Sequence, residues 1–206
     1  PRVRPTEPEQ NTSRTVTMKD ARVTLPSYGT QWVVPSYRTA KNGEAEALDL
    51  LAEILGGGTR SRLYQALVVN SDAASGVGAY YNGTMLDDTS FAVYGSPRNA
   101  AGLARVETAV AAEIQRIQRD GVTDNELEKA KNRLIRSMVF AKDSPASMAN
   151  IYGAALTTGS TVQDVQKWPA RLRAVTADQV KAVAVRYLRP KIAVTGYLLP
   201  DDSTPN

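Results

Sequence analysis

The sequence predicts an α+β fold in which one mixed or antiparallel sheet is covered by helices, giving two layers. Three observations lead to this prediction. Short segments of extended character lie near both ends of the chain and in its middle, stripes of apolar residues at helical spacing separate them, and we find no internal repeat. An order of strands, helices, hairpin, helices and strand is typical of one sheet covered by helices.

The first part of the chain predicts two strands followed by two helices. Residues 15–24 and 31–37 are the expected strands, and the second carries Trp32, Val33 and Val34. The first helix has one apolar face and ends at Gly56, Gly57 and Gly58, as a left-handed C-cap would. Its apolar face consists of Ala47, Leu50, Leu51, Ile54 and Leu55. Residues 61–69 predict a shorter second helix.

The middle of the chain predicts a β-hairpin and then a long helix. Residues 76–84 and 89–94 alternate in polarity, and Asp87-Asp88 lies at the reversal between them. After Ser96-Pro97 an apolar stripe at helical spacing runs to Gly121, which should end that helix. The stripe consists of Leu103, Val106, Val110, Ile114 and Ile117.

The last third predicts further helices and a closing strand. Thr123 with Glu126, and Thr176 with Gln179, have the spacing of capping boxes and so indicate two helix starts. Between them, one helix should open at Asp143-Ser144-Pro145 and run to about Leu156. A weaker helical pattern covers residues 162–172 and is interrupted by Pro169. Residues 192–199 should form the final strand.

The ends of the chain differ in composition from the rest. Residues 1–14 are rich in proline and polar side chains, which predicts an inter-domain linker. We therefore expect one domain over residues 15–200, with a short tail at residues 201–206. Because the chain does not begin with Met, we interpret it as a fragment of a longer protein.

Composition excludes several kinds of site. The 206 residues contain no His and no Cys, which rules out Ser-His-Asp triads, cysteine nucleophiles and histidine- or thiolate-ligated zinc in this chain. The formal net charge is +4, but the cations are interleaved with acids, which favours a mixed surface over a nucleic-acid interface. No apolar run approaches the ~20 residues of a membrane span.

One local motif remains open between two interpretations. Arg60, Arg62 and Tyr64 crowd the start of the second helix, where they could contact a peptide or a partner domain. They could equally be an exposed helix start with extended arginine side chains. The preceding glycines do not form a phosphate loop, because the Gly-Lys-Ser/Thr ending is missing.

The block LAEILGGGTRSRLYQALVVNSDAASGVGAYY, residues 51–81, resembles the C-terminal, non-catalytic domain of pitrilysin/insulinase-type zinc peptidases. Within that family it is similar to the bacterial relatives of mitochondrial processing peptidase. The motif on which this resemblance depends is a helix that ends in glycines and is followed by Ser61, Arg62, Leu63 and Tyr64. The resemblance continues through the hairpin, the helix VTDNELEKAKNRL and the tail VTADQVKAVAVRYLRPKIAVTGYLLP, and so covers about residues 16–200.

This resemblance implies how the chain would function. An N-terminal domain of such peptidases carries His-x-x-Glu-His and the zinc, and the C-terminal domain forms the other wall of a chamber for unfolded peptides. This chain would then contribute no catalytic residue, metal ligand or cofactor. Zinc would belong to the N-terminal domain of the same protein or to a homologous subunit. We expect a dimer for the full-length protein and a periplasmic location, as is usual for bacterial relatives.

Active members of the family often carry an Arg and, seven residues later, a Tyr that reach toward the substrate. An ungapped alignment puts Val68 and Ser75 at these two positions, and neither side chain can replace the missing group. This departure leaves a second hypothesis open, in which the protein is a catalytically dead scaffold or interaction subunit related to processing peptidases.

Overall fold

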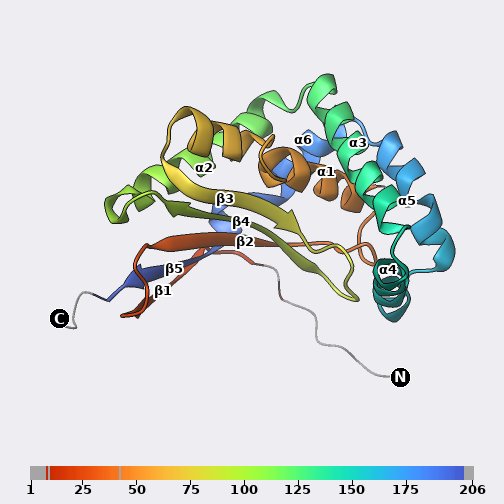
Figure 1. Ribbon diagram of the computed structural model, residues 1–206, viewed down its shortest axis with the longest axis horizontal. Helices are drawn as coiled ribbons and strands as arrows, with labels where there is room; N and C mark the ends of the chain where they lie inside the picture. Colours follow the sequence, from red (N-terminus) through yellow and green to blue (C-terminus); the bar gives the residue numbers. More distant parts are fainter. Residues whose placement is uncertain (1–7, 9, 42, 202–206) are drawn as a thin grey trace.

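The computed structural model describes residue 8, residues 10–41 and residues 43–201. Most of the predicted linker and tail therefore lies outside the described residues. The described residues form an α+β fold of two layers, with the helices on one face of a five-stranded sheet (Figure 1). The strand order is β1-β5-β2-β4-β3, with β1 parallel to β5 and the other neighbouring pairs antiparallel. The predicted fold class, a mixed sheet covered by helices, is confirmed.

The sheet consists of five strands taken from three regions of the chain. They are β1 (Arg14–Asp20), β2 (Ser27–Val34), β3 (Ala74–Tyr81), β4 (Thr89–Pro97) and β5 (Val194–Pro200). The hairpin is the β3–β4 pair, in which Tyr81 lies opposite Phe91. The closing strand inserts between β1 and β2, so the two ends of the described chain meet in the sheet.

The helical layer contains six α-helices and one π-helical segment among the described residues. These are α1 (Glu44–Gly56), the π-helix η1 (Tyr64–Asn70), α2 (Leu103–Asp120), α3 (Asp124–Ala141), α4 (Pro145–Thr157), α5 (Val162–Ala174) and α6 (Ala177–Tyr187). Short 3₁₀ turns, η2 (Ala100–Gly102) and η3 (Pro190–Ile192), precede α2 and β5. The predicted capping boxes of Thr123 with Glu126 and Thr176 with Gln179 are both formed.

Several predicted strand boundaries are wrong, including those of the hairpin arms, which were expected at residues 76–84 and 89–94 but span Ala74–Tyr81 and Thr89–Pro97. The second strand was expected at residues 31–37 but spans Ser27–Val34, since Pro35 offers no N–H and Ser36 turns the chain through a hydrogen bond from its amide to Thr39 Oγ1 of 3.0 Å. The first strand, expected to reach residue 24, ends at Asp20, where Asp20 accepts hydrogen bonds from the amides of Arg22 and Val23. The closing strand begins two residues late, after η3.

Two helices also differ from expectation. The segment predicted as a short helix over 61–69 becomes π-helical at Tyr64, and the amide of Ser71 donates to the carbonyl of Ala66 five residues back. Pro169 does not interrupt α5, which runs unbroken from Val162 to Ala174. A capping box of Thr161 with Asp164 secures its start, and Arg171 ties it to Glu46 of α1 at 2.5 Å.

The core lies between the sheet and α1. On this face of the sheet Trp32 and Phe91 meet at 6.5 Å between ring centroids, and the leucines of α1 cover them. The largest fully buried side chains include Leu48, Leu50, Leu51 and Leu55 of α1. The predicted apolar face of the first helix is therefore the centre of the core.

Gly56 sets how closely α1 approaches the sheet. It is still helical, and the left-handed conformation expected of the glycine run occurs at Gly58, with φ of 91°. A Cβ atom on Gly56 would overlap the backbone of Gly78 and Ala79 in β3. Only a glycine therefore allows this helix end to rest on the strand.

We expect Gly56→Ala to lower the free energy of unfolding by about 3 kcal/mol, because α1 must move away from β3. Urea denaturation of the purified chain measures this. The matched control is Gly153→Ala in α4, where an added Cβ meets nothing within 4 Å. This control should raise stability by about 0.5–1 kcal/mol, since alanine is the better helix former. Equal effects of the two substitutions would contradict the packing argument.

Candidate partner-binding surface

Arg62 is engaged within the molecule. Its guanidinium donates from Nε to Glu126 Oε1 at 2.8 Å and from Nη2 to Glu126 Oε2 at 2.9 Å. Nη2 also donates to the carbonyl of Gly121 at 3.1 Å. The side chain is only 17% exposed. Arg62 therefore joins the glycine turn after α1 to the start of α3, a structural role that the sequence pattern did not reveal.

Glu126 is the partner that makes this junction sensitive to acid. The hydrogen bonds from Arg62, aided by those from Thr123, lower the pKa of Glu126 from 4.5 to about 2. The same carboxylate closes the capping box by accepting from the amide of Thr123 at 2.9 Å. One side chain thus stabilises both the helix start and its attachment to the preceding turn.

Arg60 and Tyr64 lie beside this junction but differ in exposure. Arg60 is exposed, whereas Tyr64 is half-buried at the first residue of η1. Arg60 and Arg62 line a hollow of about 370 Å³ together with Glu126 and Arg133. The three predicted contact residues are therefore neighbours, but a role of Arg60, Arg62 and Tyr64 in contacting a peptide or a partner stays a prediction.

Val68 and Ser75 lie on different elements. Val68 is half-buried in η1 and packs against the core. Ser75 is exposed at a bulge in β3, where its hydroxyl donates to the carbonyls of Ser96 and Pro97 at 3.3 and 3.1 Å. Neither presents a cationic or phenolic group. Their correspondence to the Arg and Tyr positions of active peptidases stays a prediction.

The face of the sheet that the helices leave open carries exposed apolar side chains. Figure 1 shows the helices gathered on one side of the sheet, and no described helix covers the other side. Strand register places every second residue on this face, for example Val16 opposite Gly196 and Gly29 opposite Tyr94. We call this surface the open face. Its large exposed hydrophobic residues are Val16, Met18, Val33, Tyr80, Tyr94 and Val194.

Two parts of the open face have distinct shapes. On β3 and β4, Tyr80 and Tyr94 lie 6.4 Å apart between ring centroids, and the ring of Tyr94 covers Gly78. On β1 and β5, Val16, Met18 and Leu198 line a shallow hollow of about 400 Å³. Met18 is 59% and Val16 62% exposed. Exposed apolar side chains gathered on one face in this way are typical of a protein-binding surface.

The described residues hold no cluster of three or more Asp or Glu side chains arranged to bind a metal ion. With no His or Cys in the sequence, this chain supplies no conventional zinc site. None of the helices among the described residues is long and apolar enough to cross a bilayer.

A sequence profile described as the peptidase M16 inactive domain matches residues 1–134. The chain belongs to this family. A relative described as an uncharacterized zinc protease, from Streptomyces coelicolor, is 30% identical over 154 residues, which is 74% of this chain and 33% of the relative. The chain thus spans about a third of that protein, and 43% of a zinc protease of Helicobacter pylori.

Solved structures share the fold of this M16 domain. A protease from Helicobacter pylori superposes with a TM-score of 0.88 at 21% identity, covering 97% of this chain and 47% of that one. The inactive peptidase domain of a Bordetella parapertussis protein gives a TM-score of 0.77 at 20% identity, covering 92% and 97% of the two chains. The profile match confirms the resemblance to the non-catalytic domain of this peptidase family, and these structures confirm the fold.

Sequence reasoning missed the open face of this M16 domain. The alternation of Val16 and Met18 in RTVTMKD identifies a strand, but alternation alone does not say which face the helices cover. Only the pairing of β1 with β5 assigns both residues to the uncovered side.

Acid titration tests the junction between Arg62 and Glu126. Because the pKa of Glu126 is lowered on folding, its stabilising effect is complete above about pH 4.5 and is lost as pH falls toward 2. We expect Glu126→Gln to be less stable than the wild type at pH 6 and to approach it at pH 2.5. Urea denaturation at both pH values measures the difference.

Arg62→Ala should lower the free energy of unfolding at pH 6 by about 2 kcal/mol, since it removes charge-assisted hydrogen bonds at a partly buried site. Arg60→Ala, at the exposed neighbouring arginine, is the matched control and should change stability by less than about 0.5 kcal/mol. If the difference in unfolding free energy between the wild type and Glu126→Gln did not change with pH, the Arg62–Glu126 pair would not be the source of the acid sensitivity.

Proposed function

We propose that the chain is the non-catalytic C-terminal half of a zinc metalloendopeptidase. In this proposal it forms one wall of a chamber and helps to bind unfolded peptides. Zinc and the attacking water belong to a separate N-terminal domain or to a partner chain. Membership of the M16 inactive-domain family carries the proposal, and the lack of any histidine agrees with it.

The open face is the surface that we assign to the partner half. It carries exposed apolar side chains on all five strands and is opposite the helical layer, so a second domain could cover it without displacing any described helix. Removal of such apolar side chains from water favours association. The full-length protein would then have two halves in contact, and we propose that it dimerises and resides in the periplasm.

A second candidate function is supported by one observation. Val68 and Ser75 stand where active relatives are expected to carry an Arg and a Tyr, and neither side chain can contact a developing oxyanion in their place. The protein would then be a catalytically dead scaffold or interaction subunit. Zinc content and peptide cleavage of the full-length protein separate the two candidates, since the scaffold needs neither.

The first expected outcome is that the purified chain does not cleave an unstructured peptide, even with equimolar zinc. The reason is that its sequence has no His or Cys and that its described residues hold no cluster of carboxylates that could bind zinc. Cleavage is followed by mass spectrometry, with the full-length protein as positive control. Chelator-sensitive turnover that co-purifies with the chain through successive columns would overturn the proposal.

The second expected outcome concerns the open face in the full-length protein. Met18→Lys combined with Tyr94→Lys should reduce peptide cleavage about tenfold, since two charges are placed where we expect the partner half to pack. Val185→Lys is the matched control, because Val185 is 49% exposed on α6 in the helical layer. Unchanged cleavage by the double variant, with the control also unchanged, would remove the open face from the proposal.

A further inference from the structure

A second surface feature lies among the outer helices, beside the end of β3. A cavity of about 600 Å³ opens between α3, α4, α5 and the loop that follows β3. Its volume is within the range of pockets that hold small molecules. We call it the Asp49 cavity after the carboxylate at its inner end.

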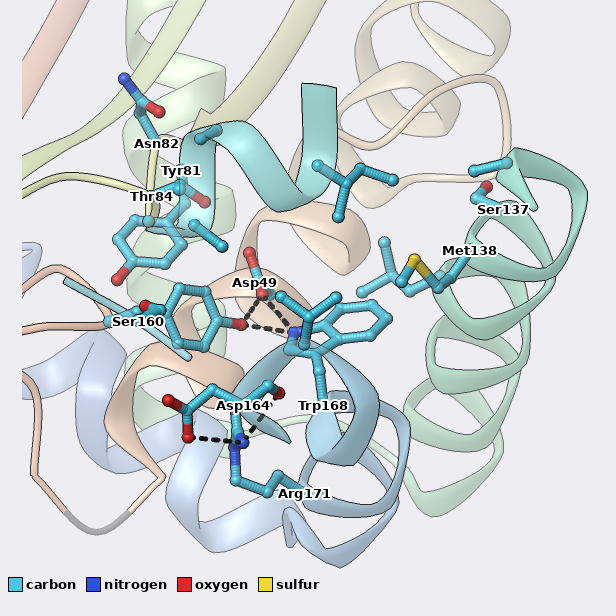
Figure 2. A pocket seen from close by; sticks show the side chains of 18 of the residues that line it. Asp49, Tyr81, Asn82, Thr84, Ser137, Met138, Ser160, Asp164, Trp168 and Arg171 are labelled. Carbon is cyan, nitrogen blue, oxygen red and sulfur yellow. Dashed lines mark hydrogen bonds and ion pairs between the residues drawn. The ribbon is translucent and has the colours of Figure 1, made fainter. Parts of the chain in front are cut away.

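One side of the Asp49 cavity is apolar. Six aliphatic side chains from three helices form it: Leu134, Met138, Ile151, Ala154, Ala155 and Val165. Figure 2 shows Met138 on α3 across the cavity from Trp168 on α5. The helix α4 closes this side with little packing of its own, because Ala155 is the one buried residue along it. An apolar group of a ligand could therefore fit into the cavity with only small movements of α4.

The inner end of the cavity is polar and is organised around Asp49. Tyr37 donates its hydroxyl proton to Asp49 Oδ2, and the indole Nε1 of Trp168 donates to the Tyr37 hydroxyl at 2.6 Å and to Asp49 Oδ2 at 3.4 Å. Both hydrogen bonds of Asp49 use this one oxygen (Figure 2). Oδ1 accepts no hydrogen bond from the described residues.

Asp49 differs from the other carboxylates of α1, each of which has a cation. Glu46 is paired with Arg171, and Glu53 with Arg133. Asp49 lies between them on the same face and is half-buried, and no described Lys or Arg forms an ion pair with it. Its remaining accessible surface faces the cavity. A carboxylate in such surroundings is stabilised by a cation that reaches it through the cavity.

We propose that the Asp49 cavity binds an apolar molecule or side chain that ends in one protonated amine. The amine donates to Asp49 Oδ1, and the apolar body lies against Met138, Ile151 and Val165. The site is separate from the open face, and no part of the proposed peptidase chemistry uses it.

Acid–base behaviour supports this assignment. Burial raises the pKa of Asp49 to about 7, a change that the hydrogen bonds from Tyr37 and Trp168 oppose and the nearby Glu46 reinforces. The other groups around it are the phenols of Tyr37 and Tyr81, whose pKa values burial raises, and the Asp164 and Arg171 side chains at the rim. In the pH range 6 to 8, Asp49 is therefore the group that changes charge.

The test uses three probes with the same body and different heads: 4-phenylbutylamine, 4-phenylbutan-1-ol and 4-phenylbutyrate. Isothermal titration calorimetry with the full chain at pH 8 should show the amine binding about tenfold more tightly than the alcohol, and the carboxylate not binding. Because Asp49 must be ionised, amine affinity should fall about tenfold from pH 8 to pH 6. Equal affinity for the three probes, or no amine binding at millimolar concentration, overturns the proposal.

Variants locate the site. Asp49→Asn keeps an acceptor for Tyr37 and Trp168 but removes the charge, and should abolish the preference for the amine; Asp120→Asn, at an exposed carboxylate on α2, is the matched control. Ala154→Phe fills the cavity and should abolish binding of the amine, whereas Ala149→Phe on the same helix, outside the cavity lining, should not. The Ala154 pair keeps the test decisive if Asp49→Asn fails to fold.

A final comparison separates two sources of the amine. An acetylated peptide with one lysine between leucines presents the same chemistry as 4-phenylbutylamine but on a chain. Binding of the peptide that Ala154→Phe abolishes assigns the cavity to lysine side chains, and binding of the small amine alone assigns it to free amines. Amine binding that survives both Asp49→Asn and Ala154→Phe contradicts the proposed site.

Discussion

The structure depends on the position of α1 between two layers. Ten of its thirteen residues are buried, and it contacts β3 and β4 on one side and α3, α5 and α6 on the other. The face toward the sheet is made of leucines and ends at Gly56, whose missing side chain lets the backbone of the helix touch β3. No other residue type permits that separation, and so the spacing of the two layers is set at this contact.

The other face of α1 explains how the outer helices are attached. It carries Glu46 and Glu53 two turns apart, and each meets a different helix: Glu46 pairs with Arg171 of α5, and Glu53 with Arg133 of α3. Near its start, Glu44 accepts from Arg186 and Tyr187 of α6. Buried carboxylates are stable only when paired or hydrogen-bonded, so these contacts fix where each outer helix lies. Asp49 belongs to the same row but has two neutral donors in place of a cation.

The arrangement gives the domain two surfaces with separate properties. Helices lie on one side of the sheet, so the strands present apolar residues on the other side, where we assign a partner half. The helical side carries the Asp49 cavity, which α4 borders with only one buried residue of its own. The two surfaces use different side chains, since none of the exposed hydrophobic residues that define the open face lines the cavity.

Most elements could be predicted because their signals are local. The apolar stripe of α1, the capping boxes at Thr123 and Thr176, and the alternation in the β3–β4 hairpin each depend on residues within a few positions of one another. The errors have distant or subtle causes. Pro169 remains inside α5 because a capping box and the ion pair with α1 stabilise that helix. The segment η1 adopts a π-helical form that no residue pattern predicts.

By itself, the sequence determined the class of fold, the order of the elements and, through its lack of His and Cys, that this chain carries no conventional zinc site. It also determined the family through motifs in a defined order. Tertiary structure alone decided that Arg62 meets Glu126 across 64 residues, that Val16 and Met18 face away from the helices, and that Asp49 meets Trp168. The physical reason is the distance along the chain over which each property is decided. Periodicity and capping depend on residues within one or two helical turns of each other, whereas interaction partners, burial and exposed faces depend on how distant elements pack.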